Sequence, residues 1–180
     1  KEAGAVLVVD NTTMTPFGQD PLSLGADIVV AADTKAPNGH SDALFGHTST
    51  RDEALFQAMR EWRKLSGSIP GPFEAWQVHR GLETLELRFE RMCDTAGTIA
   101  PRLADHKAVG SVVYPGLPAH PDHDLAARQM RRMGFLIGLT LPLPFILSSF
   151  HFTKSVTERS DNGFLQIGCR RKAVSISASL

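Results

Sequence analysis

In the sequence DIVVAADTKAPNGHSD, residues 27–42, an apolar, β-branched run leads into a turn-rich loop that carries Lys35. A similar run, AVLVVD at residues 5–10, comes earlier in the chain and ends in Asp10. Short runs of this composition are typical of strands that are covered on both faces, as in α/β proteins. The sequence therefore predicts an α/β fold in which two such strands each lead into polar residues.

Helical and extended patterns alternate along the rest of the chain. The expected strands lie at residues 43–50, 110–116 and 135–141, and the expected helices at residues 51–67, 73–106 and 123–134, with a short helical turn at residues 20–25. Gly81, Gly97 and Pro101 make breaks or kinks in the longest helical pattern plausible. Because helix and strand alternate again after this pattern, we expect a second small α/β unit that begins near Asp105.

Composition excludes several classes of protein. The 180 residues include 42% apolar and 21% charged side chains, and 19 basic side chains balance 19 acidic ones, so no net charge favours binding to nucleic acid or to an acidic membrane. Cys93 and Cys169 are too few for a disulfide framework, which predicts a reducing, cytoplasmic setting. Residues 135–152 carry no Asp, Glu, Lys or Arg, but Pro142 and Pro144 interrupt them, which predicts a buried strand and a turn rather than a membrane span.

Asp10 and Lys35 are the strongest candidates for chemistry. Each has an ordinary interpretation, since Asp10 could start a turn and Lys35 could be a solvated surface charge. Both follow strands that could be neighbours in one sheet, and ligands bind at the carboxyl ends of strands in open α/β sheets. A carboxylate for a pyridinium nitrogen and a lysine for an aldehyde are the groups that pyridoxal 5'-phosphate (PLP) requires.

The histidines are weaker candidates. His40 lies beside Asp42, and His120 and His123 form an HxxH pattern that Pro121 separates from regular helical presentation. Zinc sites need three or four convergent ligands with support behind them. We therefore expect solvated loops at these positions and no metal site.

Several motifs together resemble the cysteine and methionine metabolism family of PLP-dependent enzymes, the trans-sulfuration family. They are VDNTTMTP at 9–16, LGADIVV at 24–30, DTKAPNGHSD at 33–42, WQVHRGLETLELR at 76–88, YPGLPAHPDHDLA at 114–126 and MGFLIGLTL at 133–141. The resemblance covers residues 1–141 and is nearest to bacterial cystathionine gamma-lyases. It implies an α/β fold of the aspartate-aminotransferase-like type (fold type I). Residues 1–105 would end the large PLP-binding domain, and residues 106–180 would form an incomplete small domain that is aberrant after about residue 141.

The resemblance also implies roles for particular residues. Lys35 would bind the cofactor covalently and move protons, Asp10 would pair with the ring nitrogen, and Thr34 would contact the cofactor phosphate. Ser149 shows a weak similarity in position to a substrate-binding serine of the family. The implied reaction splits cystathionine into cysteine, 2-oxobutanoate and ammonia. Cystathionine beta-lyase, gamma-synthase and methionine gamma-lyase activities stay open as alternatives. The implied assembly is a homotetramer.

Departures from the family pattern support a second hypothesis. Ala32 stands where the family often has a serine that binds the phosphate, and the amino-terminal part of the family pattern, with its glycine-rich phosphate loop, is not in this sequence. Residues 142–180 do not continue the pattern, which a reading-frame change or an incomplete gene would explain. The alternative to an enzyme is therefore a catalytically silent fragment.

Overall fold

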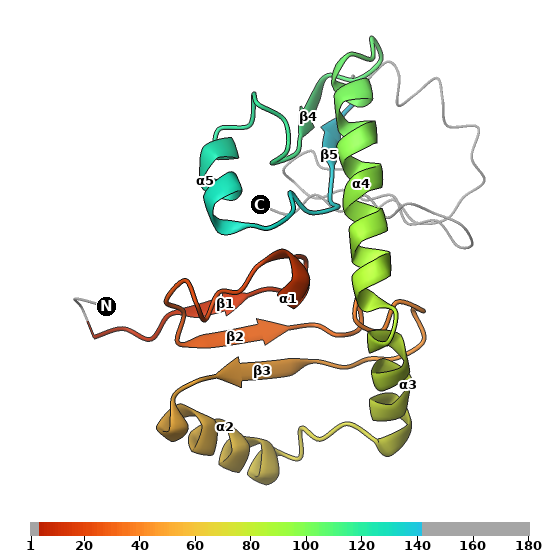
Figure 1. The fold of residues 1–180 in the computed structure, drawn as a ribbon. Helices are drawn as coiled ribbons and strands as arrows, with labels where there is room; N and C mark the ends of the chain where they lie inside the picture. Colours follow the sequence, from red (N-terminus) through yellow and green to blue (C-terminus); the bar gives the residue numbers. More distant parts are fainter. Residues whose placement is uncertain (1–3, 142–180) are drawn as a thin grey trace. The chain divides into compact units, whose positions relative to one another are not determined.

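The computed structural model describes residues 4–141, and these divide into two compact units (Figure 1). The first unit contains residues 4–92 and 127–132, and the second contains residues 93–126 and 133–141. The division at residues 92 and 93 falls inside a helix, whereas the sequence predicts a domain boundary near Asp105. Ser149 and the predicted aberrant tail lie outside the described residues.

The first unit is built on a three-stranded sheet. Its strands are β1 (Val8–Asp10), β2 (Ile28–Ala31) and β3 (His47–Thr50), in the order β1-β2-β3. β1 and β2 run parallel with Asp10 opposite Val30, and β3 runs antiparallel to β2. The three predicted strands and the neighbouring positions of the first two are thus confirmed. The expectation of two covered faces is not met for β1 within the described residues, because β1 is an edge strand there and Val8 is 51% exposed.

Two helices of the first unit have clear causes in the sequence. Helix α2 (Glu53–Ser66) begins where the Asp52 side chain accepts a hydrogen bond from the Leu55 amide at 2.9 Å, and it ends at Gly67 with a φ of +73°. The four-residue helix α1 (Thr15–Gly18) has Pro16 in its first turn, where the fixed φ of proline suits a helix start. The helical turn predicted at residues 20–25 is a hydrogen-bonded turn over residues 21–25 that forms no regular helix. Gly25 ends it as predicted, with a φ of +100° and with its amide donating to the Leu22 carbonyl at 3.3 Å.

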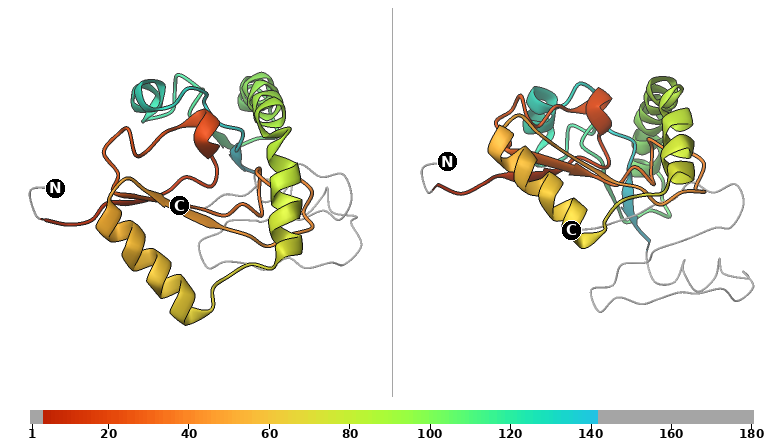
Figure 2. Two further views of the ribbon diagram at one scale, coloured as in Figure 1. Left: turned by 60° about the horizontal axis from the view of Figure 1, so that its bottom comes forward. Right: turned by 90° about the horizontal axis from the view of Figure 1, so that it is seen from below.

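The longest helical pattern forms two helices, α3 (Pro72–Leu82) and α4 (Leu85–Ala104). The predicted break near Gly81 is confirmed, whereas Pro101 lies inside α4 without ending it. Figure 2 shows α2 and α3 as separate rods joined by an extended segment. Phe89 of α4 is fully buried and packs on the residues that follow β1: a methyl group built on Gly18 would lie 2.6 Å from Phe89 Cζ and 2.8 Å from Met14 Cε.

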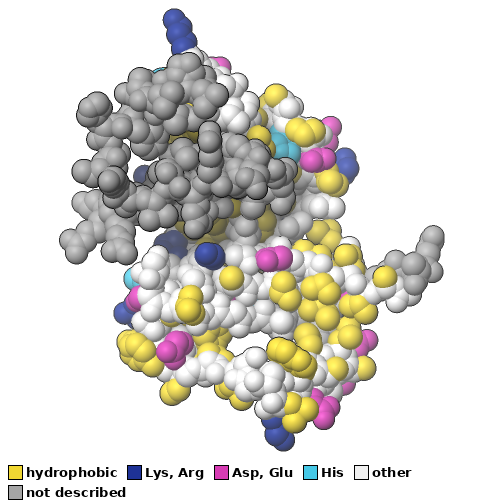
Figure 3. Space-filling model, turned by 180° about the vertical axis from the view of Figure 1, so that it is seen from behind, with side chains coloured by type: hydrophobic (Ala, Val, Ile, Leu, Met, Phe, Trp, Pro, Cys, Tyr) yellow, Lys and Arg dark blue, Asp and Glu magenta, His cyan; other side chains and the backbone are white. Residues whose placement is uncertain are grey.

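Apolar side chains remain at the surface of the first unit. Figure 3 shows several of them open on one face of the molecule. The large apolar residues that are more than half exposed in this unit include Val6, Val8, Leu24, Leu44, Trp62, Leu65, Ile69, Phe73 and Trp76. Helix α2 has no buried residue: Leu55 and Met59 are half-buried, and Trp62 and Leu65 are exposed in the described part of the chain.

The second unit contains β4 (Ser111–Val113), β5 (Gly138–Thr140) and the start of α5 (His123–Gln129). β4 and β5 pair antiparallel, and Ala96, Ala100 and Tyr114 form the buried centre of the unit. The predicted strand, helix and strand are confirmed, but the helix ends at Gln129 rather than at residue 134. The reason lies in the first unit, where the Arg131 amide donates to the Gly18 carbonyl at 2.7 Å instead of continuing the helix. No helix within residues 4–141 is long and apolar enough to cross a membrane.

Candidate functional site

Asp10 lies at the carboxyl end of β1 and is exposed. Hydrogen bonds from the Thr12 side chain and backbone lower the pKa of the Asp10 carboxyl, against a small opposing effect of burial. One of these bonds joins the Thr12 amide to Asp10 Oδ1 at 2.8 Å. Because hydrogen bonds to the charged form favour it, Asp10 is an anion at neutral pH.

Thr12 also connects the ends of the two parallel strands. Its Oγ1 accepts a hydrogen bond from the Ala32 amide at 2.8 Å, while its side chain bonds Asp10. Ala32 follows β2 directly and lies three residues before Lys35. The sequence alone did not indicate Thr12 as a site residue. The available signal was a threonine two residues after an aspartate at a strand end, a pattern typical of side-chain-bonded turns.

The backbone around Lys35 is held in a compact turn. The Lys35 amide donates to the Ala32 carbonyl at 3.2 Å, and the Gly39 amide donates to the Lys35 carbonyl at 2.8 Å. Gly39 has a φ of +75°, which glycine adopts without a steric penalty. The Lys35 side chain itself is exposed. The turn therefore presents the lysine amine to solvent from an ordered backbone.

Asn38 anchors the same turn from inside. It is completely buried, its Nδ2 donates to Asp42 Oδ1 at 2.9 Å, and its amide donates to the Asp33 carbonyl at 2.8 Å. The carbonyl of Asn38 lies so close to Gly81 that no side chain could be placed at position 81 without a collision. Close backbone contact with α3 thus requires a glycine at position 81.

Asp33, two residues before Lys35, forms a hydrogen-bonded pair with His47. His47 Nδ1 lies 2.8 Å from both carboxylate oxygens of Asp33, which is 4% exposed. The hydrogen bond to Asp33 raises the pKa of His47, partial burial lowers it, and the charge of Asp33 raises it again, with a net increase. The pair joins the loop before Lys35 to the first residue of β3, a contact that the sequence did not indicate.

This pair predicts a pH-dependent stability. The pKa of His47 in the folded chain lies above its usual 6.5, so the stabilisation is fully present below pH 6.5 and is lost as the pH rises through the folded pKa. We expect the melting temperature of the wild-type chain to fall over this interval more than that of His47→Gln. Melting curves followed by circular dichroism between pH 5 and 9 measure the difference. Parallel curves for the two proteins would show that the pair does not stabilise the fold.

The hydrogen bonds of Thr34 decide whether its hydroxyl is available to bind a phosphate group. Its hydroxyl donates to the Phe45 carbonyl at 3.2 Å and accepts from the Phe45 amide at 3.0 Å. The proton of the hydroxyl is therefore used within the loop, and a phosphate would have to compete for it. The anionic Asp10 and the exposed Lys35 fit a pyridinium nitrogen and an aldehyde, whereas Thr34 fits the phosphate only after its bond to Phe45 is exchanged.

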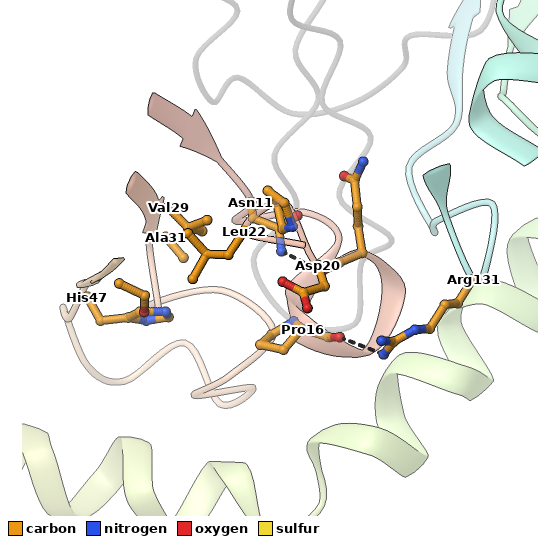
Figure 4. A pocket seen from close by; sticks show the side chains of 11 residues that line it. Asn11, Pro16, Asp20, Leu22, Val29, Ala31, His47 and Arg131 are labelled. Carbon is orange, nitrogen blue, oxygen red and sulfur yellow. Dashed lines mark hydrogen bonds between the residues drawn. The ribbon is translucent and has the colours of Figure 1, made fainter. Parts of the chain in front are cut away.

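A cavity of about 260 Å³ lies in the first unit, between the sheet and the segment that follows β1 (Figure 4). Its lining includes Asp20, His47 and Arg131, and the Arg131 guanidinium donates to the Pro16 carbonyl at 3.2 Å. Neither Asp10, Thr34 nor Lys35 is part of this lining. Within residues 4–141, no group of three His, Cys, Asp or Glu side chains is arranged to hold a metal ion. The predicted site residues and this cavity are thus separate features of the unit.

Similarity to known proteins extends over most of the chain. Residues 1–157 match the family described as Cys/Met metabolism PLP-dependent enzyme. A putative cystathionine gamma-lyase of Streptomyces coelicolor is 48% identical over 139 residues, which make up 77% of this chain and 36% of that protein. A cystathionine gamma-synthase of Mycobacterium tuberculosis is 45% identical over 140 residues, which make up 78% of this chain and 36% of that protein.

A solved structure agrees with these relatives. A methionine gamma lyase from Micromonospora echinospora is 41% identical and matches with a TM-score of 0.78, over 86% of this chain and 43% of that one. The chain spans about 36% of the length of the two curated relatives named above. The similar region is therefore only a part of each of these longer relatives.

Proposed function

The chain belongs to the Cys/Met metabolism PLP-dependent enzyme family, and from this premise we propose that it forms the lysine-bearing part of a PLP-dependent enzyme acting at a carbon–sulfur bond. The observation that carries the proposal is the pairing of β1 with β2 in parallel, with the anionic Asp10 at the end of one strand and Lys35 in the loop after the other. Parallel neighbours end at the same edge of a sheet, where ligands of α/β proteins bind.

In the proposed site, Asp10 would supply a negative charge and Lys35 would transfer protons. PLP, when bound, supplies an electron sink for the carbanion formed at the α-carbon of an amino acid. The carboxylate of Asp10 would hold a protonated ring nitrogen by charge pairing. The amine of Lys35 would hold the aldehyde and, once released, would move the proton of the substrate α-carbon. Thr34 would donate its hydroxyl to the phosphate.

The substrate class follows from the relatives. The names of the relatives reported above support chemistry at a carbon–sulfur bond of an amino acid, and the beta-lyase alternative stays open. We propose cystathionine as the first substrate to test, with cysteine, 2-oxobutanoate and ammonia as products. A homotetramer in the cytoplasm is proposed as the working form. The exposed Trp62 and Leu65 of α2 support an assembly, and the presence of only two cysteines supports a reducing compartment.

The experiment mixes the purified chain with PLP and cystathionine, and it measures a visible absorbance band of the bound cofactor and the appearance of a 2-oxo acid. A band together with 2-oxo acid supports an active lyase. A band without product supports cofactor binding by a chain that lacks the rest of the catalytic machinery. Absence of both would overturn the proposal for this chain and favour a catalytically silent fragment.

Asp10→Asn tests the negative charge at position 10, because asparagine has nearly the same shape as aspartate. The amide keeps the size and hydrogen-bond acceptor of the side chain but removes the negative charge that would keep the ring nitrogen protonated. We expect the loaded chain to exchange the α-proton of an amino acid on the order of 100-fold more slowly, the scale at which one charge-stabilising group contributes. Loss of proton signal in D₂O by NMR measures this rate. Asp52→Asn, at the start of α2, is the control, and equal rates in Asp10→Asn and wild type would contradict the role.

A further inference from the structure

We infer that Arg88 is a positioning residue that fixes the backbone on the carboxyl side of Lys35, an inference that rests on the proposed function of Lys35. Arg88 lies in the first turn of α4, more than fifty residues away in sequence. Its guanidinium nevertheless meets the two peptide carbonyls that follow the lysine. Neither the resemblance nor the helical pattern assigned any role to this residue.

The contacts of Arg88 converge on one short stretch of backbone. Nη1 donates to the Ala36 carbonyl at 2.6 Å, and Nη2 donates to the Pro37 carbonyl at 3.2 Å. Nη2 also donates to the Gly81 carbonyl at 2.7 Å, and Nε donates to Thr84 Oγ1 at 3.0 Å. One planar cation thus joins the lysine turn, the end of α3 and the start of α4.

The surrounding backbone is shaped to receive this side chain. A methyl group on Gly39 would collide with the Arg88 guanidinium, and one on Gly81 would collide with the carbonyls of Pro37 and Asn38. The two glycines therefore allow the turn, the helix end and the guanidinium to meet at one point. Partial burial lowers the pKa of Arg88, and the four partners above are uncharged oxygens, so the side chain serves as a hydrogen-bond fork within this unit rather than as half of one of its salt bridges.

The hydrogen bonds of the Arg88 guanidinium end on the backbone next to Lys35. Ala36 and Pro37 are the first two residues after Lys35, and both are buried. The turn holds the lysine from its amino side through Ala32, whereas Arg88 holds it from its carboxyl side. A displacement of about 1 Å in a reacting group can cost on the order of 100-fold in rate. Freeing this side of the lysine is thus expected to slow its reaction with an aldehyde without changing the amine itself.

The first arm of the test uses the chain without cofactor. Hydrogen exchange is measured at the amides of Asn38 and Gly39, which bond Asp33 and Lys35. In Arg88→Lys we expect exchange at both amides to be at least about tenfold faster than in wild type, because a lysine cannot reproduce the planar fork. The Leu55 amide, bonded to Asp52, should not change. Arg102→Ala is the control, since Arg102 is an exposed arginine of the same helix.

The second arm measures the rate of covalent attachment of PLP to Lys35 over a range of PLP concentrations. We expect Arg88→Lys to lower the limiting rate about tenfold or more and to leave the half-saturating concentration unchanged, since only the placement of the amine is affected. Arg88→Ala should show a larger fall, and if it does not fold, Arg88→Lys decides the question. Equal limiting rates in Arg88→Lys and wild type would overturn the positioning role, even if exchange were faster.

The two arms also separate this inference from the proposed function. If the wild-type chain attaches no PLP, the proposed function fails, and the exchange data alone decide whether Arg88 orders the lysine turn. Unchanged exchange at Asn38 and Gly39 would overturn the inference whether or not PLP binds.

Discussion

Lys35→Ala is expected to abolish covalent attachment of PLP to this chain. An alanine has no amine, and the visible band of the bound cofactor depends on a bond between the lysine nitrogen and the cofactor aldehyde. The measurement is absorbance after addition of PLP, followed by borohydride reduction, proteolysis and mass spectrometry. In the wild-type chain, the added pyridoxyl mass should lie on the peptide that contains Lys35, and in Lys35→Ala it should be absent.

Unspecific reaction is the competing explanation, because PLP can react with any exposed amine. Lys64→Ala is the matched control, since Lys64 is an exposed lysine in the last turn of α2. It should retain the band and the label at Lys35. A label spread evenly over several lysines, or a band that survives in Lys35→Ala, would contradict the assignment of Lys35.

Phe89→Ala is expected to lower the free energy of unfolding by about 3–5 kcal/mol, the usual cost of emptying a fully buried phenylalanine site. Phe89 has no exposed surface, and its ring packs against Gly18 in the segment that follows Asp10. Its removal leaves a cavity between α4 and α1. Urea unfolding followed by circular dichroism measures the change.

The matched control is Leu87→Ala, two residues away on the same helix. Leu87 is 70% exposed, so its truncation should change stability by less than about 0.5 kcal/mol. Phe89→Leu, which keeps much of the apolar volume, should fall between the two. Equal stabilities for Phe89→Ala and Leu87→Ala would show that α4 does not support the segment after β1.

The elements that could be predicted from the sequence are those with a local cause. Two apolar runs predicted β1 and β2, and Gly67 predicted the end of α2, because strand composition and helix termination act over a few residues. The predicted aspartate-aminotransferase-like fold class and the predicted family are both confirmed by the relatives. The turn at residues 21–25 also has a local cause, since Gly25 adopts the positive φ that ends it, whereas the short helix that Pro16 starts earlier was not predicted.

The parts that could not be predicted depend on contacts between distant residues. Asp33 meets His47 across a loop, and Arg88 reaches Ala36 across 52 positions. The helical pattern of residues 85–104 does not show which of its arginines is partly buried and which stays exposed. The end of α5 at Gln129 likewise follows from the bond between the Arg131 amide and Gly18. The roles of Asp10 and Lys35 were inferred from their positions after two strands and from the family resemblance, and the role of Thr34 came from the resemblance alone. All three roles stay predictions.

The meeting of Gly39, Gly81 and Arg88 has a consequence for how this chain can change over generations. A larger residue at position 39 would have to adopt a φ of +75° and also displace the arginine, and the arginine loses its partners once position 81 pushes the Pro37 carbonyl aside. The three positions are therefore bound by epistasis, so that the effect of one mutation depends on the state of the other two.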